Sequence, residues 1–116
     1  MNMDIKNDER PWGSFRQFTD NEATTVKILS VGAGHRLSLQ LHRKRSEFWR
    51  VLSGHPSITI GETTIQAKQG DEFFVPAQTI HRIGAPDDSA EVLEIAFGDF
   101  DENDIVRLDD AYGRVS

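Results

Sequence analysis

Residues 35–42 read His35-Arg-Leu-Ser-Leu-Gln-Leu-His42, and three leucines alternate with polar side chains along them. Successive side chains of a β-strand point to opposite faces, so this period of two is typical of a half-buried strand. The alternation predicts a strand with the three leucines on one face and Ser38, Gln40 and His42 on the other. Polar side chains gathered on one face of a strand indicate a site that uses them.

Similar short segments recur along the chain, with turn residues about every ten positions. We expect further strands at residues 25–31, 47–53, 57–60, 63–66, 72–75, 81–83 and 90–97. Gly61-Glu62 separates two of these segments by the length of a tight hairpin turn. Many short strands without a long helix predict an all-β sandwich or barrel.

The remaining segments lie at the two ends of the chain. Residues 1–9 are expected to form an N-terminal arm. Residues 99–116 are expected to form an acidic C-terminal tail with at most one helical turn. No linker or repeat divides the chain, so residues 1–116 are expected to form a single domain.

Composition excludes several classes of protein. The chain has 116 residues and no cysteine, which rules out disulfides, thiolate zinc sites and a cysteine nucleophile. No apolar run reaches the ~20 residues that cross a bilayer, and the first residues do not resemble a signal peptide. We therefore expect a cytoplasmic protein with no membrane partner.

Charge is distributed unevenly. The net charge of −6 argues against nucleic acid as a partner. Residues 99–110 contain six acids and one base, whereas residues 35–50 contain five bases and one acid. The basic segment is either a solvated turn or, because it adjoins the polar face of the first strand, a binding site for a small phosphorylated or carboxylated substrate.

Four polar residues are spaced to converge on one point. Gln40 and His42 share a strand face, Glu47 follows where a turn would bring the next strand alongside, and His81 follows a separate turn after Pro76. Nitrogen and oxygen ligands converging in this way bind a divalent metal ion. The alternative is that these side chains only hydrogen-bond one another inside the barrel.

The spacing of these residues resembles the two cupin motifs. The first motif is matched by Gly34…Gln40-x-His42-x4-Glu47…Gly54, with Gln40 in place of the usual leading histidine. The second is matched by Gly70-x5-Pro76-x-Gln78-x2-His81, with Gln78 where the family usually has glycine. The resemblance implies a cupin fold, which is a jelly-roll barrel or double-stranded β-helix.

A closer resemblance, to the type II phosphomannose isomerases, covers residues 10–114. The motifs that carry it include Arg10-Pro-Trp-Gly13, Arg45-Ser-Glu47-x-Trp49, Val51-x-Ser-Gly54, Ile80-His-Arg82, Asp104-Ile-Val-Arg107 and Tyr112-Gly-Arg114. In bacteria this domain often follows a mannose-1-phosphate guanylyltransferase domain, and it also occurs alone. The resemblance implies metal-dependent conversion of mannose 6-phosphate to fructose 6-phosphate.

The resemblance also implies roles for particular residues. The metal ligands would be Gln40, His42, Glu47 and His81. This mixed nitrogen and oxygen set favours zinc, with manganese, iron, cobalt and nickel as alternatives. A sugar phosphate needs a cationic clamp, for which the candidates are Lys44, Arg45, Arg107 and Arg114.

Proton transfer between C1 and C2 of the sugar also needs a base. Three interpretations of Glu94 are open: it is an inward-facing base, a residue that orients a ligand histidine, or an outward-facing charge at the edge of the sheet. Tyr112 is a further candidate for the base. Arg45 is the second residue to which we assign a catalytic role. Trp12 and Trp49 are either core residues or a platform for a sugar ring.

Three positions depart from the resembled family, which often has His, His and Gln where this chain has Lys44, Phe48 and Ala96. These departures keep a second hypothesis open, a non-catalytic metal-binding cupin module that binds a sugar or nucleotide-sugar. A third, an iron dioxygenase, is disfavoured by Gln40. A homodimer in which the segment before Arg10 swaps between copies is a further expectation from the resemblance.

Overall fold

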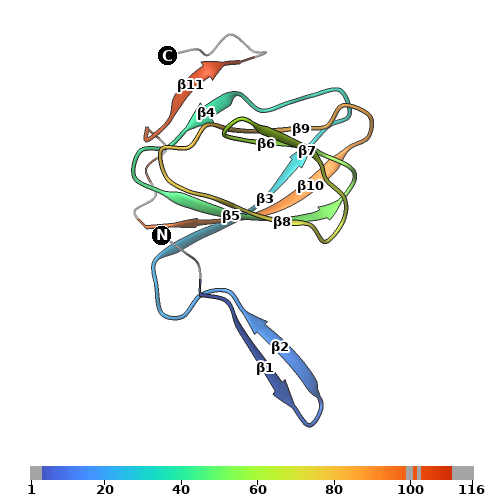
Figure 1. Cartoon of the computed structure of the whole chain (residues 1–116), viewed down its shortest axis with the longest axis vertical. Helices are drawn as coiled ribbons and strands as arrows, with labels where there is room; N and C mark the ends of the chain where they lie inside the picture. Colours follow the sequence, from blue (N-terminus) through green and yellow to red (C-terminus); the bar gives the residue numbers. More distant parts are fainter. Residues whose placement is uncertain (1–3, 99–100, 102, 111–116) are drawn as a thin grey trace.

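The computed structural model describes residues 4–98, 101 and 103–110, and within them every regular element is a β-strand (Figure 1). The strands are β1 (Lys6–Arg10), β2 (Gly13–Gln17), β3 (Thr24–Val31), β4 (Leu39–Leu41), β5 (Ser46–Ser53), β6 (Ser57–Ile60), β7 (Thr63–Gln66), β8 (Glu72–Val75), β9 (His81–Gly84), β10 (Ala90–Phe97) and β11 (Val106–Asp109). The all-β prediction is confirmed. In this part of the chain, no helix is long and apolar enough to cross a membrane.

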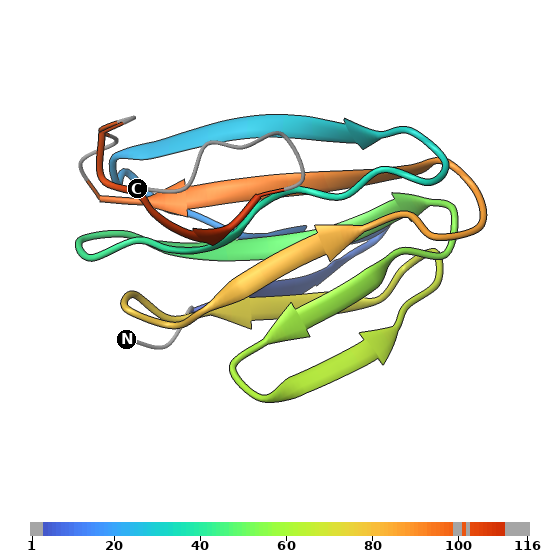
Figure 2. The ribbon, with the colours of Figure 1, turned by 90° about the horizontal axis from the view of Figure 1, so that it is seen from above.

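Two antiparallel sheets form the body of the protein. One has the order β3-β10-β5-β8 and the other β11-β4-β9-β6-β7, and they face each other as the two layers of a sandwich (Figures 1 and 2). The apolar core lies between them and includes Trp49, Val51, Ile58, Ile83 and Val92, each at most 1% exposed. This core occupies one part of the interior and leaves the rest to polar side chains.

Most predicted strands are observed within one residue of their expected bounds, including the hairpin around Gly61. The stretch 35–42 is the exception, because only Leu39–Leu41 forms a strand there. Leu37 lines the same interior cavity as Gln40, so the predicted separation of leucines from polar residues is wrong at this position. The irregular backbone before β4 interrupts the alternation on which the prediction depended.

The two ends of the chain contain strands that the sequence did not reveal. β1 and β2 form a separate two-stranded sheet that projects from the body, so the projecting unit extends past the expected arm of residues 1–9 (Figure 1). Within the expected acidic tail, Val106–Asp109 forms β11 beside β4, a strand that the sequence analysis did not predict. Residues 111–116 lie outside the described part of the chain.

The root of the hairpin packs on the outer face of the four-stranded sheet. There Phe48, Ile95 and Phe97 form a second buried cluster, against which Ile5, Phe18 and Phe74 pack. Arg16 donates two hydrogen bonds to Glu72 of β8, at 2.7 and 3.1 Å. The hairpin is therefore anchored at its base, while Trp12 at the turn is 73% exposed.

Candidate metal centre

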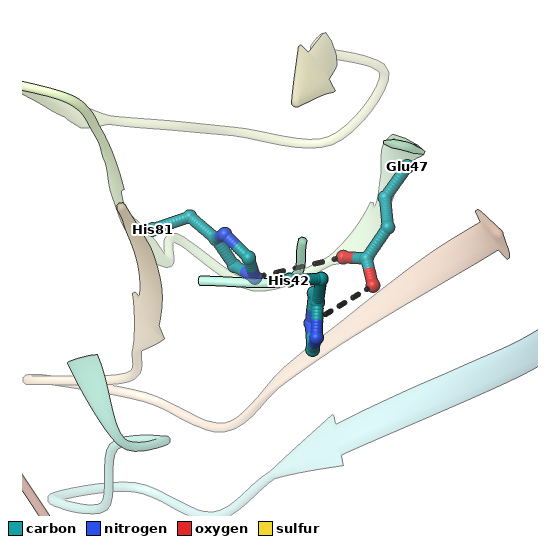
Figure 3. Close-up of side chains that lie close together, drawn as sticks. All are labelled: His42, Glu47 and His81. Atoms are coloured by element: carbon teal, nitrogen blue, oxygen red, sulfur yellow. Dashed lines mark ion pairs between the residues drawn. The ribbon is translucent and has the colours of Figure 1, made fainter. Parts of the chain in front are cut away.

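His42, Glu47 and His81 converge in the interior between the two sheets (Figure 3). His42 follows β4 directly, Glu47 lies in β5 and His81 begins β9. One ligand atom from each lies within 4.8 Å of the other two, and all three side chains are buried. The sequence prediction that these residues would meet agrees with this geometry.

Hydrogen bonds to backbone carbonyls orient both imidazole rings. His42 Nδ1 lies 2.6 Å from the Asp104 carbonyl oxygen, and His81 Nδ1 lies 2.9 Å from that of Thr79. A carbonyl only accepts, so Nδ1 carries the proton and Nε2 keeps its lone pair. Burial lowers the pKa of both histidines, so both rings are neutral at pH 7.

Both lone pairs point toward the same carboxylate. Nε2 of His42 lies 3.3 Å from Glu47 Oε2, and Nε2 of His81 lies 3.8 Å from Glu47 Oε1. Acceptors that face acceptors in a buried site need a donor or a positive charge among them, which Arg45 provides to His42 and Glu47 in this structure and which a metal ion would provide to all three residues. Two imidazole nitrogens and a carboxylate are also common ligands of zinc and other first-row metals, so the residues fit a divalent ion.

Two neighbouring side chains hold the carboxylate of Glu47. Trp49 donates from Nε1 to Oε1 at 3.1 Å, and Arg45 donates from Nε to Oε2 at 3.1 Å. Arg45 also donates from Nη2 to His42 Nε2 at 3.1 Å. Because one lone pair serves one partner, a metal ion bound to His42 would replace this last bond.

Gln40, which the resemblance implies as a fourth ligand, lies in the same cavity as the three clustered residues. It pairs directly with His81 across β4 and β9, so the two side chains share a face of the sheet. Both line a cavity of about 550 Å³ together with His42 and Glu47. The cavity leaves room for a small polar ligand beside the candidate metal.

Asp104, whose role the sequence analysis missed, holds the loop that presents His42. Its carboxylate accepts hydrogen bonds from the backbone nitrogens of Arg43 and Lys44, at 2.9 and 3.0 Å. Its carbonyl accepts the His42 bond described above. The motif Asp104-Ile-Val-Arg107 was the available signal, since it placed Asp104 among the residues that carry the resemblance.

A second backbone contact supports the same loop. Gln78 donates from its backbone nitrogen to the His42 carbonyl at 2.6 Å. Its φ of +65° is in the left-handed region, which favours the glycine that cupins usually have there. The motif before His81 therefore keeps its backbone conformation without its glycine.

Glu94 lies on the cavity side of β10 and is 4% exposed, so its interpretation as an outward edge charge is wrong. Burial and the nearby charge of Glu47 raise its pKa to about 7. Its Oε1 is buried and has no hydrogen-bond partner among the described residues. A carboxyl group with this pKa both accepts and returns a proton near neutral pH.

The residues expected to bind the phosphate group differ in where the structure places them. Arg45 and Arg107 line the cavity, whereas Lys44 is exposed and does not. Arg114 lies outside the described residues, as does Tyr112. One cavity cation was missed by the sequence analysis, Lys27 of β3. The local sequence contains no signal for it, because the apolar neighbours Val26 and Ile28 favour an outward position for Lys27.

The tryptophans do not form a shared platform. Trp49 is 1% exposed and contacts the His81 ring edge-on at 5.5 Å between ring centroids, whereas Trp12 is on the projecting hairpin. The interpretation of Trp49 as a core residue is confirmed. Trp49 also belongs to the site, because it holds Glu47.

Only one of the three departures from the resembled family faces the metal ligands. Lys44 is exposed, and Phe48 belongs to the cluster on the outer face of the sheet. Ala96 pairs directly with Glu47 across β10 and β5. Of these three positions, a difference in chemistry would therefore come from residue 96.

A sandwich of two antiparallel sheets with His, Glu and His converging inside it defines this protein as a cupin. Solved structures agree: a cupin protein from Bacteroides fragilis is 26% identical, with a TM-score of 0.59 over 67% of this chain and 70% of its own. The capsular polysaccharide assembling protein CapF from Staphylococcus aureus shares the fold at 18% identity, with a TM-score of 0.65 over 91% of this chain and 34% of its own.

The mannose-6-phosphate isomerase C-terminal family matches residues 3–110, and the chain belongs to this family. The alginate biosynthesis protein AlgA of Pseudomonas aeruginosa is 36% identical over 92% of this chain. The mannose-1-phosphate guanylyltransferase RfbM of Salmonella typhimurium is 33% identical over 90% of this chain. The chain spans only 23% and 22% of the lengths of these two relatives.

Proposed function

We propose that this protein is a metal-dependent sugar-phosphate isomerase that converts mannose 6-phosphate to fructose 6-phosphate. The observation that carries the proposal is that one cavity contains the His42–Glu47–His81 cluster and, separately, the buried carboxyl group of Glu94. Membership of the family gives the substrate class, and the cavity supplies the groups that the reaction needs.

The reaction moves one proton between neighbouring carbons. Glu94 takes the proton from C2 of the open-chain aldose, while the aldehyde oxygen O1 takes a proton from water and an enediol forms. Glu94 then returns its proton to C1, and O2 gives its proton back to water and becomes the ketone oxygen. The burial of Glu94 in the cavity suits this exchange, because burial raises the pKa of the carboxyl group and the group is a base in one half of the reaction and an acid in the other.

Gln40, His42, Glu47 and His81 would hold the divalent ion, for which zinc is the first choice from the ligand types. When bound, the metal supplies Lewis-acid stabilisation of negative charge on the sugar oxygens. Arg45 is proposed as the second catalytic residue, because its guanidinium lies between His42 and Glu47 and adds positive charge next to the reacting oxygens.

A second candidate is a non-catalytic metal-binding cupin module that binds a sugar or nucleotide-sugar. Ala96 favours it, because this small side chain lies opposite Glu47 where the resembled family has a glutamine. Loss of a polar group beside the metal would leave binding intact and weaken the alignment of the substrate for proton transfer.

The deciding experiment measures isomerisation of mannose 6-phosphate by metal-reconstituted protein, with a chelated sample as control and total metal content on both. We expect turnover that the chelator abolishes and that Glu94→Gln reduces at least a hundredfold, the usual contribution of a general base. Bound metal without turnover would reject the isomerase and support the binding module. Protein that takes up no metal would reject both.

A further inference from the structure

Lys27 is a charged residue on the interior face of an amphipathic strand. Its neighbours Val26 and Ile28 point away from the sandwich and are 58% and 56% exposed. Lys27 itself is half-buried and lines the cavity with Leu29. β3 thus presents apolar side chains outward and a cation inward, the reverse of what stability alone favours.

Strand register places Lys27 relative to the site. In the four-stranded sheet, Lys27 pairs with Glu94 across β3 and β10, and Glu94 pairs with Trp49 across β10 and β5. Paired residues of neighbouring antiparallel strands share a face, so these three side chains form one row on the cavity side. Lys27 is at the end of this row, on an edge strand.

The opposite sheet contains a matching row. Arg107 pairs with Gln40 across β11 and β4, and Gln40 pairs with His81 across β4 and β9. The ring contact of 5.5 Å between Trp49 and His81 joins the two rows at the other end. Arg107 is therefore the counterpart of Lys27, again on an edge strand of its sheet.

The two cations consequently face each other across the sandwich. β3 and β11 lie toward the same edge when the molecule is seen from above (Figure 2). Packed sheets are about 10 Å apart, a distance that a lysine and an arginine bridge when both contact one ligand. Two strand spacings, again about 10 Å, separate this edge from the Trp49–His81 contact, which suits the length of a hexose phosphate.

We propose that Lys27 and Arg107 form a two-cation clamp for the phosphate group of the substrate, and that Lys27 is a specificity-determining residue of this protein. The proposal rests on the proposed function for its substrate class, a sugar carrying a phosphate monoester. A phosphate ester carries a charge of about −2 at pH 7 and several acceptor oxygens. A lysine supplies a point charge to such a group, and an arginine supplies paired donors.

Two buried polar atoms near Lys27 and Arg107 lack hydrogen-bond partners among the described residues, which supports a ligand between these two cations. Arg107 Nε is buried and has no hydrogen-bond partner among the described residues. Glu94 Oε1, on the neighbouring strand, is also without one, while the positive charge of Lys27 acts on the carboxyl group of Glu94. The contrasting explanation is that Lys27 only neutralises the carboxylates of the cavity.

The test is titration of the metal-loaded full chain with mannose 6-phosphate, mannose and inorganic phosphate, followed by NMR. The variants are Lys27→Met, Lys27→Arg and Arg107→Met. Lys68→Met is the matched control, because Lys68 is exposed and does not line the cavity. Metal content is measured on every sample.

We expect Lys27→Met and Arg107→Met each to weaken binding of mannose 6-phosphate and inorganic phosphate at least tenfold. Binding of mannose and metal should change less than twofold, and Lys27→Arg should restore most of the phosphate affinity. Equal weakening for mannose and mannose 6-phosphate would overturn the clamp and assign Lys27 to charge neutralisation. Unchanged phosphate affinity in Lys27→Met, or wild-type protein that does not bind phosphate, would also overturn it.

These binding measurements are independent of turnover. Phosphate affinity that depends on Lys27 in a protein without isomerase activity would support the clamp and reject the proposed reaction. Isomerase activity with an unchanged KM for mannose 6-phosphate in Lys27→Met would support the reaction and reject the clamp. If Lys27→Met does not fold, Arg107→Met and Lys27→Arg carry the same comparison.

Discussion

At the scale of single residues, two backbone hydrogen bonds orient the histidines of the candidate metal centre. Asp104 and Thr79 accept from Nδ1 of His42 and His81, so both Nε2 atoms face Glu47. If either imidazole ring were rotated by half a turn, its Nδ1 would no longer donate to the backbone carbonyl, and that buried carbonyl would be left without a hydrogen bond. The chemistry of the site thus depends on two oxygens that are not ligands themselves.

His42→Ala or His81→Ala should reduce bound metal from about one ion per chain to nearly none, because two or three ligands hold a divalent ion weakly. Metal content after gel filtration measures this, with circular dichroism to confirm that the sheets are retained. His55→Ala is the control, since His55 is exposed and pairs with Asp88 at 2.9 Å. Unchanged metal content in both site variants would show that the ligand assignment is wrong.

Glu94→Gln should change the pH dependence of stability in the metal-free protein. The pKa of Glu94 is raised from 4.5 to about 7 by folding, so its favourable contribution is present below pH 4.5 and lost as the pH rises through about 7. Glutamine does not ionise, so the variant should gain roughly 3 kcal/mol on the wild type over this window.

Urea unfolding of chelated protein at low and at high pH measures this gain. The two histidines affect both proteins alike, because both proteins contain them. Glu91→Gln, an exposed substitution on the same strand, is the control. A difference between wild type and Glu94→Gln that stays constant with pH would mean that Glu94 is not held in a raised-pKa environment.

At the scale of elements, the turn after β5 is constrained by the strand that packs beside it. Gly54 has a φ of +80°, and a Cβ there would collide with the backbone of Ser89 and Ala90. This glycine closes the strand that carries Glu47 and Trp49. A shift of the turn would therefore be transmitted to the metal site.

Gly54→Ala should destabilise the protein by about 3 kcal/mol or more, since left-handed strain and a backbone clash add. Gly61→Ala is the matched control, with a φ of +61° and no atom within 4 Å of the added Cβ. It should cost only about 1 kcal/mol. Urea denaturation compares the stabilities of the two variants. Equal losses of stability in both would show that the contact with Ser89 does not add to the cost of a side chain at residue 54.

At the scale of the whole molecule, the projecting hairpin exposes apolar side chains. A two-stranded hairpin is marginally stable alone, and the contacts of β1–β2 with the body among the described residues lie at its base. Trp12 at its turn is 73% exposed, and Val26 and Ile28 form an exposed apolar surface on the outer face of β3. We propose that these surfaces meet in a homodimer.

Trp12→Lys should weaken this dimer at least tenfold, because a charge would replace a large apolar contact. Sedimentation equilibrium at micromolar concentration measures the association. Ile65→Lys is the control, since Ile65 is an exposed apolar residue on β7. A wild-type protein that sediments as a monomer would remove the proposal.

The amino-acid sequence by itself determined the class of fold and three residues of the candidate metal centre. Period-two alternation and regularly spaced glycines are local signals, and they located β5 through β10 within a residue of their observed bounds. His42, Glu47 and His81 were recognisable because their spacing depends on strand and turn lengths, which are also local.

Only the tertiary structure decided what lies between the two sheets. Register across strands places Lys27 opposite Glu94 and Ala96 opposite Glu47, and no local pattern specifies which strands become neighbours. The structure likewise placed Lys44 outside the cavity and turned residues 106–109 into β11. Short segments such as β11 form strands because an edge is available to pair with, which depends on the assembled sheet rather than on their own side chains.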